Sequence, residues 1–418
     1  MKAASIVQPP SEMRDRLVRV LFVTNMFPNE RNIQQGIFVW ELANAVKSLG
    51  HDIRVVSIEP VLAWPFNKLN VYQHQVANGE VPAFDCIIRH EVIQFPRNIG
   101  VCFRYRAWAA VLLKKIETMW PGWRPNIVHS HTLIPGGLVA REMCGKLCVA
   151  HVSTSHGADT RVHMKRCKTR SAIKRMLSQG HYVVGVGQPV VDALRPLAKY
   201  PDRIRRIYNG VNIDTLRPAN VQLRQRFARR RIILGMGNLV KTKGFDLLIR
   251  AFAAVAGDFP AWDLVIVGGG VQWRNLVQAV RQLDLAGRVH FTGPLPHAEA
   301  MEWMELCDIF CLPSWSEGLG IVYLEAMACG KPVIGVTGQG IDPIIRENAT
   351  GLLTEPKSID SLVSALRRLM MEDMTRMQMG RAGKELIHEN FTWDMCARQY
   401  VKLYCEILGE KNSNECSV

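Results

Sequence analysis

Runs of β-branched and other apolar residues alternate along the chain with stretches in which apolar residues recur every three or four positions. The apolar runs predict strands, and the amphipathic stretches between them, such as 37–49 and 359–370, predict helices. The predicted strands are 19–25, 52–58, 126–131, 151–156, 182–187, 231–237, 263–268, 288–293, 309–314 and 332–336. This alternation of strands and helices predicts an α/β fold with doubly wound parallel sheets.

The strand–helix units fall into two series, of which the first ends near Gly187 and the second begins at Arg231. Between them lies the turn signal Asn209-Gly210. We therefore expect an N-terminal domain (1–208), a linker (209–230), a second domain (231–390) and a C-terminal helix with a polar tail (391–418). Two such domains face each other across a cleft at the carboxyl ends of their strands, where ligands bind in these folds.

Composition supports a globular chain with more than one domain. Of its 418 residues, 48% are hydrophobic and 21% are charged. No apolar stretch reaches the ~18–20 residues that a membrane span needs, and we expect a cytoplasmic protein. The eleven cysteines contain no C-x-x-C pair. We therefore expect a reducing compartment, without a disulfide framework or a zinc site.

The net charge of +15 is concentrated in one part of the chain. Residues 151–231 contain 18 Lys and Arg against 4 Asp and Glu, with the densest run at 161–177. One interpretation is a helix on an anionic membrane surface, with Val162, Ile173, Met176 and Leu177 facing lipid. A plain solvated helix face is the alternative. Because the run contains no aromatic residue, we do not expect nucleic-acid binding.

The most informative stretch for chemistry is PSWSEGLGIVYLEAMACGKPVI at residues 313–334. A predicted strand leads into a glycine-bearing loop and then into a helix. Gly318 and Gly320 let the backbone approach a ligand, and the helix N-terminus offers free N–H groups to a phosphate. Glu317 and Glu325 can accept hydrogen bonds from vicinal hydroxyls of a sugar or a ribose. In the alternative interpretation, Glu317 caps the helix and Glu325 forms an ion pair outside the site.

This stretch resembles the E-x7-E signature of the retaining glycosyltransferases of family 4, which have the two-domain GT-B architecture. Further segments match the family in order: LFVTNMFPNERNIQQGIFVWELANAVKSLGHDIRVV, IVHSHTLIPGGL, STSHGADTR, YNGVNIDTLRP, MGNLVKTKGFDLLIRAF, VIVGGGVQWRNL, VHFTGPLP and GQGIDPIIRENATGLL. The resemblance extends from about residue 18 to residue 408. One departure is Asn212, which stands where the family usually has Asp.

The resemblance implies roles for individual residues. The residues that it assigns to donor binding are Gly36, Asn238, Lys243, Gly293, Leu295, Glu317, Gly318, Leu319, Gly320 and Glu325. Among these, Glu325 would hold the ribose hydroxyls of a sugar nucleotide, Glu317 the transferred sugar, and Lys243 the diphosphate. The residues that it assigns to catalysis are His156, Glu317 and Lys243, with His156 beside the donor sugar.

A second departure affects the phosphate contacts. The family commonly has Arg five residues before the lysine, and Asn238 stands at that place here. A site without this cation should bind the diphosphate less tightly, unless Lys241 replaces it. No Asp-x-Asp sequence is present to hold a divalent ion at a diphosphate, so we expect metal-independent chemistry without a cofactor. We expect His129 and His131 to be hydrogen-bonded core or rim histidines.

The resemblance implies that the chain moves a hexose-type sugar, with retention, from a nucleoside-diphosphate sugar to a glycan or polyprenol-linked acceptor. The N-terminal segment resembles enzymes of bacterial surface-polysaccharide assembly. The alternatives are a sugar-nucleotide epimerase of the same architecture and a catalytically silent sugar-nucleotide-binding subunit. A nicotinamide dehydrogenase fits poorly, because only one glycine follows the first predicted strand, in MFPNERNIQQG. In the last predicted helix we expect Trp393, Tyr400 and Tyr404 to be packing residues.

Overall fold

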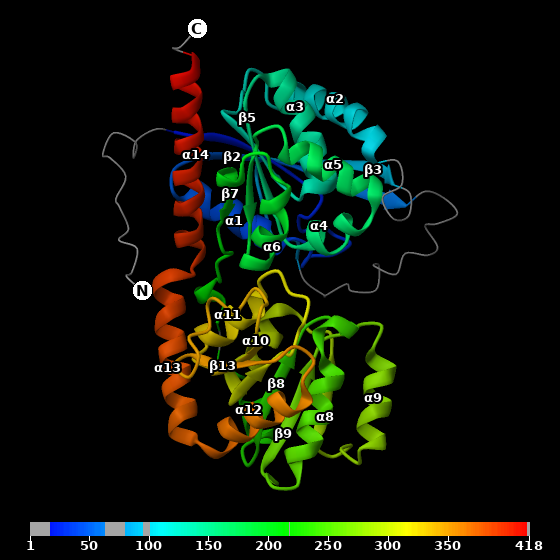
Figure 1. Ribbon diagram of the computed structural model, residues 1–418, viewed down its shortest axis with the longest axis vertical. Coiled ribbons are helices and arrows are strands. Elements are labelled where there is room, and N and C mark those ends of the chain that lie inside the picture. The colour runs from blue at the N-terminus through cyan, green and yellow to red at the C-terminus, as the bar shows by residue number, and fades with distance from the viewer. Residues whose placement is uncertain (1–16, 63–79, 95–100, 217, 416–418) are drawn as a thin grey trace.

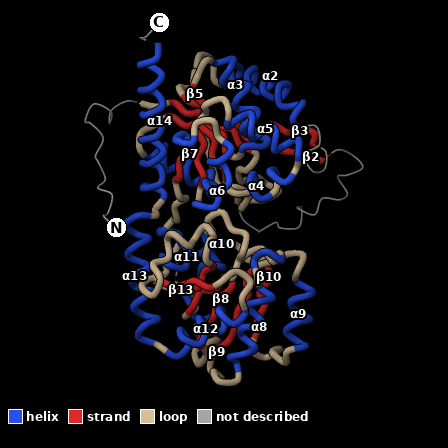
Figure 2. Tube along the Cα trace, in the orientation of Figure 1, coloured by secondary structure: helices blue, strands red, loops and turns tan. Residues whose placement is uncertain are grey.

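The structure, a computed structural model, describes residues 17–62, 80–94, 101–216 and 218–415. It consists of two α/β domains, which lie one above the other in Figure 1. Helices cover both faces of the sheet in each domain (Figure 2). This is the two-domain doubly wound arrangement that the sequence predicts.

The N-terminal domain contains a seven-stranded parallel sheet with the strand order β3-β2-β1-β4-β5-β6-β7. Its strands are β1 (Arg19–Thr24), β2 (Asp52–Leu62), β3 (Ile87–Gln94), β4 (Ile127–His131), β5 (Ala150–Ser155), β6 (Tyr182–Gly185) and β7 (Ile204–Arg206). The chain order reverses between β1 and β4, and loops at such a switch point open towards ligands.

The second domain contains a six-stranded parallel sheet with the strand order β10-β9-β8-β11-β12-β13. Its strands are β8 (Arg231–Met236), β9 (Trp262–Val267), β10 (Val289–Gly293), β11 (Ile309–Cys311), β12 (Val333–Val336) and β13 (Gly351–Thr354). Here β8 pairs with both β9 and β11, so the switch point lies between β8 and β11. The loops that follow these two strands carry Lys243 and Glu317.

Helices link the strands within each domain. Those of the N-terminal domain are α1 (Ile37–Ser48), α2 (Val101–Met119), α3 (Leu138–Leu147), α4 (Ala158–Arg161), α5 (Cys167–Leu177) and α6 (Gln188–Leu194). The helices after the N-terminal domain, in the linker, the second domain and the C-terminal segment, are α7 (Val221–Arg226), α8 (Phe245–Ala256), α9 (Trp273–Gln282), α10 (His297–Leu306), α11 (Ile321–Ala328), α12 (Ile359–Met371), α13 (Asp373–Asn390) and α14 (Trp393–Glu415).

Three strands that the apolar runs did not predict, β3, β7 and β13, lie at edges of the two sheets. The sequence of β3 contains Arg89, His90 and Glu91, and that of β7 contains Arg205 and Arg206. A central parallel strand is buried on both faces and must be apolar throughout, whereas an edge strand is partly solvated. Because β3 and β7 contain these polar residues, a search for apolar runs does not identify them as strands.

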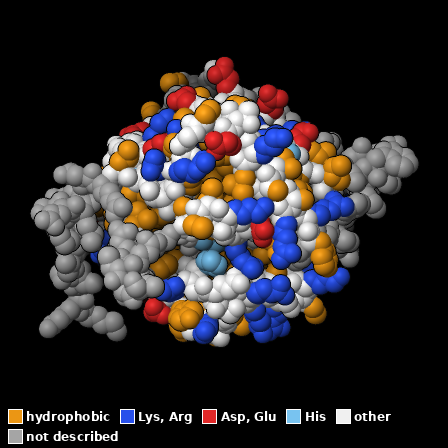
Figure 3. Space-filling view, turned by 90° about the horizontal axis from the view of Figure 1, so that it is seen from above, with side chains coloured by type: hydrophobic (Ala, Val, Ile, Leu, Met, Phe, Trp, Pro, Cys, Tyr) orange, Lys and Arg blue, Asp and Glu red, His pale blue; other side chains and the backbone are white. Residues whose placement is uncertain are grey.

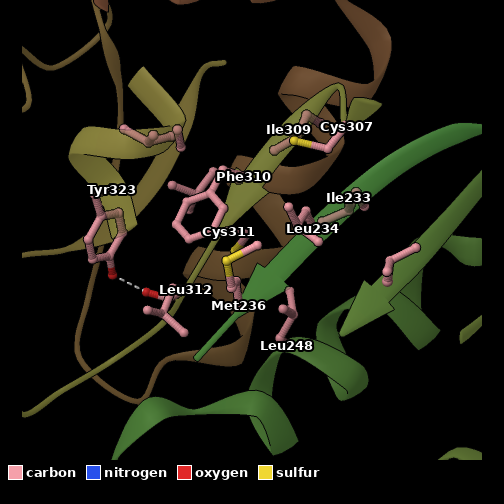
Figure 4. Packing of buried hydrophobic residues seen from close by; sticks show 14 of the residues in the cluster. Ile233, Leu234, Met236, Leu248, Cys307, Ile309, Phe310, Cys311, Leu312 and Tyr323 are labelled. Carbon is pink, nitrogen blue, oxygen red and sulfur yellow. Dashed lines mark hydrogen bonds between the residues drawn. The ribbon is translucent and has the colours of Figure 1, made fainter. Parts of the chain in front are cut away.

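The core of the second domain is built around β11. Phe310, Cys311 and Tyr323 pack together with residues of β8 and α8, and the Tyr323 hydroxyl donates a hydrogen bond to the Leu312 carbonyl (Figure 4). Burial of each large side chain of this kind contributes about 1.5–3 kcal/mol. This packing holds β11 and α11 in place, and with them the loop that carries Glu317.

The last two helices, α13 and α14, run along one side of both domains (Figure 1). α14 packs against α1, and its residues Trp393, Tyr400 and Tyr404 are buried, as predicted. The chain therefore crosses between the domains twice, at the linker and before α14. The two crossings touch, because the Val211 N–H donates to the Phe391 carbonyl over 2.8 Å.

A buried polar network fixes α14 to the N-terminal sheet. His129 is fully buried, and its Nδ1 lies 2.7 Å from the Tyr404 hydroxyl. Its Nε2 lies 2.7 Å from Thr154 Oγ1, which is 2.9 Å from the Tyr400 hydroxyl. Burial lowers the pKa of His129 to about 3, so the ring is neutral near pH 7. His129 is thus a hydrogen-bonded core histidine, as predicted.

The basic run 161–177 does not present an apolar face to lipid. In α5, Ile173, Met176 and Leu177 are buried in the core of the N-terminal domain, and only Val162 of the four predicted lipid-facing residues is exposed. The prediction of an inserted apolar face was therefore wrong, because the protein core takes up those side chains. The Lys and Arg side chains of α5 remain outside; Figure 3, which looks onto this domain, shows Lys and Arg side chains gathered at its lower right.

We predict that Tyr404→Phe lowers the free energy of unfolding by about 1–3 kcal/mol, because it leaves a buried nitrogen of His129 without its partner. Urea denaturation followed by circular dichroism measures this change. Tyr200→Phe at an exposed position is the matched control and should change stability by less than about 0.5 kcal/mol. Equal unfolding midpoints for the two variants would show that the network does not hold α14.

Candidate functional site

The two domains meet around the loop after β11. An added Cβ at Gly187, in the loop after β6, would lie 2.0 Å from the Gly318 carbonyl oxygen, and one at Gly340 would lie 2.1 Å from it. The His156 carbonyl oxygen lies 3.1 Å from the place of a Cβ on Gly318. Glycine is therefore required at Gly187 and Gly340, where a side chain would push the loops apart, whereas the contact at Gly318 is only tight.

Glu317 lies between cations of the two domains. Its Oε2 forms an ion pair with Lys243 Nζ, and its Oε1 lies 3.9 Å from Arg161 Nη1. Arg161 Nη1 also donates to the Ser316 carbonyl over 3.1 Å. The Glu317 side chain is 12% exposed, so these cations act with less solvent screening than surface charges have. The alternative role of Glu317 is not observed: its carboxylate accepts from Lys243 and Ser314, and Gly320, the N-cap of α11, has no side-chain cap.

Glu325 is also paired, with a residue that the sequence did not single out. Its Oε1 lies 2.8 Å from Nε2 of His297, the first residue of α10. The hydrogen bond that the protonated His297 donates to Glu325 raises the pKa of His297. His297 comes directly after the loop that contains Gly293 and Leu295, so this ion pair adjoins two residues that the resemblance assigns to donor binding.

The N-terminal domain adds a carboxylate to this pair. The charge of Glu41, on α1, contributes to the raised pKa of His297, and burial raises the pKa of Glu41 itself. The Asn212 side-chain amide donates to Glu41 Oε1 over 3.1 Å. The structure thereby explains why Asn stands at 212: an Asp there would bring two carboxylates together.

His156 is a mostly buried, neutral imidazole. Its Nε2 lies 3.3 Å from His131 Nδ1, and the Phe38 ring packs against it with centroids 4.4 Å apart. Burial lowers the pKa of His156 to about 3. Its Nδ1 is buried and has no hydrogen-bond partner among the described residues. The ring can therefore exchange a hydrogen bond with a hydroxyl but cannot serve as a cation near pH 7.

The remaining predicted residues occupy ends of strands and helices. Gly36 begins α1 with φ 66°, and a Cβ there would lie 2.3 Å from the Met26 carbonyl oxygen. Gly293 and Gly320 also have positive φ, at the end of β10 and the start of α11, and Leu319 is buried. Leu295, in the loop after β10, is partly buried against the core of its domain.

Asn238 and Lys241 are both exposed, in the segment after β8. The described cations that contact Glu317 are Lys243 and Arg161, and Lys241 is not among them.

Sequence reasoning missed Arg161, His131 and His297 as members of this site. Arg161 belongs to the basic run that was interpreted as a surface feature, and His131 was assigned to the core. His131 is indeed fully buried, as predicted, but it also contacts His156. No spacing in the sequence connects these residues to their partners.

Comparisons with known proteins agree with this geometry. The family "Glycosyltransferase Family 4" matches residues 35–215, and "Glycosyl transferases group 1" matches residues 220–386. The chain is 25% identical over 389 residues to the N-acetyl-alpha-D-glucosaminyl L-malate synthase of Bacillus anthracis, covering 91% of this chain and 96% of that protein. It is 28% identical over 403 residues to a GDP-mannose-dependent alpha-(1-6)-phosphatidylinositol monomannoside mannosyltransferase of Mycobacterium tuberculosis, with the same coverage.

Solved structures show the same fold. A sucrose-phosphate synthase of Thermosynechococcus elongatus superposes with a TM-score of 0.74 at 21% identity, over 94% of this chain and 100% of that one. Anabaena HepE, in complex with UDP and glucose, superposes with a TM-score of 0.71 at 17% identity, over 92% of this chain and 99% of that one. None of the described helices is long and apolar enough to cross a membrane. Two family matches that together span both domains, and a GT-B fold throughout, show that this chain belongs to the group 1, family 4 glycosyltransferases.

Proposed function

We propose that this glycosyltransferase moves a hexose-type sugar, with retention of configuration, from a nucleoside-diphosphate sugar to a glycan or polyprenol-linked acceptor. The observation that carries the proposal is the position of Glu317 and Glu325 on either side of the start of α11. Lys243 forms an ion pair with Glu317. The names of two relatives, an N-acetylglucosaminyl malate synthase and a GDP-mannose-dependent mannosyltransferase, support a sugar nucleotide as donor. We place the enzyme in bacterial cell-surface polysaccharide assembly.

Donor binding would rearrange the charges of the site. The diphosphate offers Lys243 a stronger partner than Glu317, and the N–H groups at the start of α11 add further donors to it. Glu317, released from Lys243, then accepts hydrogen bonds from hydroxyls of the transferred sugar. Glu325 accepts those of the ribose, while Gly293 and Leu295 flank the base.

The chemistry needs stabilisation of the leaving diphosphate and a route for one proton. As the sugar–phosphate bond breaks, Lys243 and the α11 N–H groups stabilise the negative charge, and the sugar passes through an oxocarbenium-like state. The acceptor hydroxyl attacks on the same face and gives its proton to the departing phosphate oxygen. His156 hydrogen-bonds the sugar as a neutral ring. With this charge supplied by the protein, we propose that transfer needs neither a metal ion nor a cofactor.

Two other functions are compatible with the same fold. A sugar-nucleotide epimerase would convert the donor without an acceptor, and a silent binding subunit would bind it without turnover. Turnover of the donor only when an acceptor is added distinguishes transfer from both.

We predict that one of UDP, GDP, ADP or CMP raises the melting temperature of the wild type and that Glu325→Ala abolishes most of this shift. A ligand at 100 times its Kd adds about 2.7 kcal/mol of stability, which a thermal-shift assay detects. Glu385→Ala, at an exposed position on α13, is the matched control and should retain the full shift. Equal nucleotide shifts in wild type and Glu325→Ala would remove Glu325 from the ribose role, and no shift with any nucleotide would contradict the proposed function.

We predict that the ion pair between His297 and Glu325 makes stability depend on pH. Because the folded-state pKa of His297 is raised, its contribution is fully present below the unfolded pKa of about 6.5 and is lost as pH rises through the folded pKa. The difference in melting temperature between wild type and His297→Gln should therefore be largest near pH 6 and disappear at alkaline pH. In a Glu325→Gln background this pH-dependent difference should shrink to the part due to Glu41; an undiminished difference there would mean that Glu325 does not cause it.

We further propose that the N-terminal domain contacts an anionic membrane surface, from the cytoplasmic side, through charge alone. Lys168, Arg170 and Lys174 are exposed on α5, while the apolar side of this helix faces the core. Each Lys or Arg near such a surface contributes about 1 kcal/mol, an attraction that salt screens.

We predict that replacing Lys168, Arg170 and Lys174 together by Gln weakens binding to vesicles of anionic lipid by about 100-fold at low salt. Vesicle co-sedimentation at increasing salt measures this effect. The matched control replaces Arg274, Arg281 and Lys384, three exposed cations of the other domain, and should bind as the wild type does. No binding by the wild type at low salt, or equal binding by the two triple variants, would show that this surface is only a solvated helix face.

A further inference from the structure

A cavity of about 340 Å³ lies between the two domains, next to the proposed donor site. Its N-terminal wall includes Arg161 and Lys165, from the segment around α4, and its other wall includes Trp315, Glu317 and Gln339. Since Glu317 belongs to both, a group in this cavity would lie beside the transferred sugar. The roles proposed for Glu317, Glu325 and Lys243 do not say which chemical group occupies this cavity.

Positive charge exceeds negative charge in the cavity. Glu317 is the acid among its described lining residues, and its carboxylate is paired with Lys243 and lies 3.9 Å from Arg161 Nη1. Arg161 is held across the cleft by the Ser316 carbonyl, and Lys165 is exposed, with no ion pair among the described residues. Lys357 adds another cation nearby, with its Nζ 5.5 Å from the centre of the Trp315 ring.

One of these cations has a partner in the donor site, because Arg161 remains beside Glu317 when Lys243 turns to the diphosphate. Lys165 has none, since the diphosphate has Lys243 and the start of α11, and the hydroxyls of a neutral sugar need acceptors and neutral donors rather than a further cation. A planar guanidinium beside an ammonium instead suits a carboxylate or a phosphate, which arginine binds with paired hydrogen bonds. Trp315, in the same wall, offers an apolar surface to the C–H face of a sugar ring.

We propose that this cavity binds an anionic group, a carboxylate or a phosphate, carried by one of the two sugars that meet in the reaction, with Arg161 and Lys165 as its ligands. The proposal rests on the proposed transfer from a sugar nucleotide. Arg161 and Lys165 belong to the N-terminal domain and Glu317 to the other, so an anion on these two cations would lie at the boundary between the domains. The charged group could belong to the transferred sugar or to the acceptor.

Isothermal titration calorimetry tests the cavity directly, with glucuronate and glucose 6-phosphate as anionic probes and glucose as the neutral one. We expect the wild type to bind the anionic probes more tightly than glucose. Arg161→Gln and Lys165→Gln should each weaken the anionic probes by about tenfold, the loss of one charged contact. Arg161→Lys should retain part of the affinity. Lys168→Gln, in the same basic run but outside the cavity, should bind as the wild type does.

A second comparison identifies the source of the charge. Tighter binding of UDP-glucuronate than of UDP-glucose, lost in Lys165→Gln, would assign the anion to the donor sugar. If Lys165→Gln does not change the relative affinity for UDP-glucuronate and UDP-glucose, and if glucuronate or glucose 6-phosphate still binds in the presence of UDP, the anion belongs to the acceptor.

Two results would overturn the proposal: glucose binding as tightly as both anionic probes, or anionic binding that Arg161→Gln and Lys165→Gln leave unchanged. Nucleotide binding is measured separately on the same proteins. If UDP, GDP, ADP or CMP still binds, the proposed function stands although the cavity proposal fails. If no nucleotide binds, the proposed function fails, and the titrations with anionic probes still decide what the cavity binds.

Discussion

The carboxylate of Glu317 is the point at which the two domains share charge. Lys243 reaches it from its own domain and Arg161 from the other, and the neighbouring Gly318 carbonyl leaves no room for a side chain at Gly187. Burying a carboxylate that is only 12% exposed costs free energy unless cations pair with it, so the loops that supply them must be held in place. The packing around β11 and the attachment of α14 to the N-terminal sheet both serve to hold these loops.

The N-terminal side of the cleft contains a group of neutral rings. Burial keeps His129, His131 and His156 neutral; ring contacts link them to one another, and a hydrogen bond links His129 to α14. On the other side, Glu317 pairs with Lys243, and Glu325 lies within hydrogen-bond distance of His297. Neutral rings and charged groups thus meet in one cleft. This combination suits a reaction in which a neutral sugar leaves an anionic phosphate.

The basic stretch of the N-terminal domain divides between two surfaces. The Lys and Arg residues of α5 point to solvent, opposite a mostly apolar buried face, whereas Arg161 and Lys165 line the cavity between the domains. Counting charges along the chain cannot distinguish these two groups, since both belong to one uninterrupted run. The turn between α4 and α5 separates them in space.

The sequence by itself determined the central strands of both sheets and the helix that carries Glu325. These elements depend on local patterns: strands buried on both faces must be continuously apolar, and the glycines of the signature must begin α11. It did not determine β3 or β7, which are half solvated at sheet edges, nor the partners of the charged residues. Arg161 and Glu317 are 156 positions apart, and His297 reaches Glu325 from another helix. Only the tertiary structure decides such contacts, because an ion pair depends on which loops the folded sheets bring together and how far they exclude water.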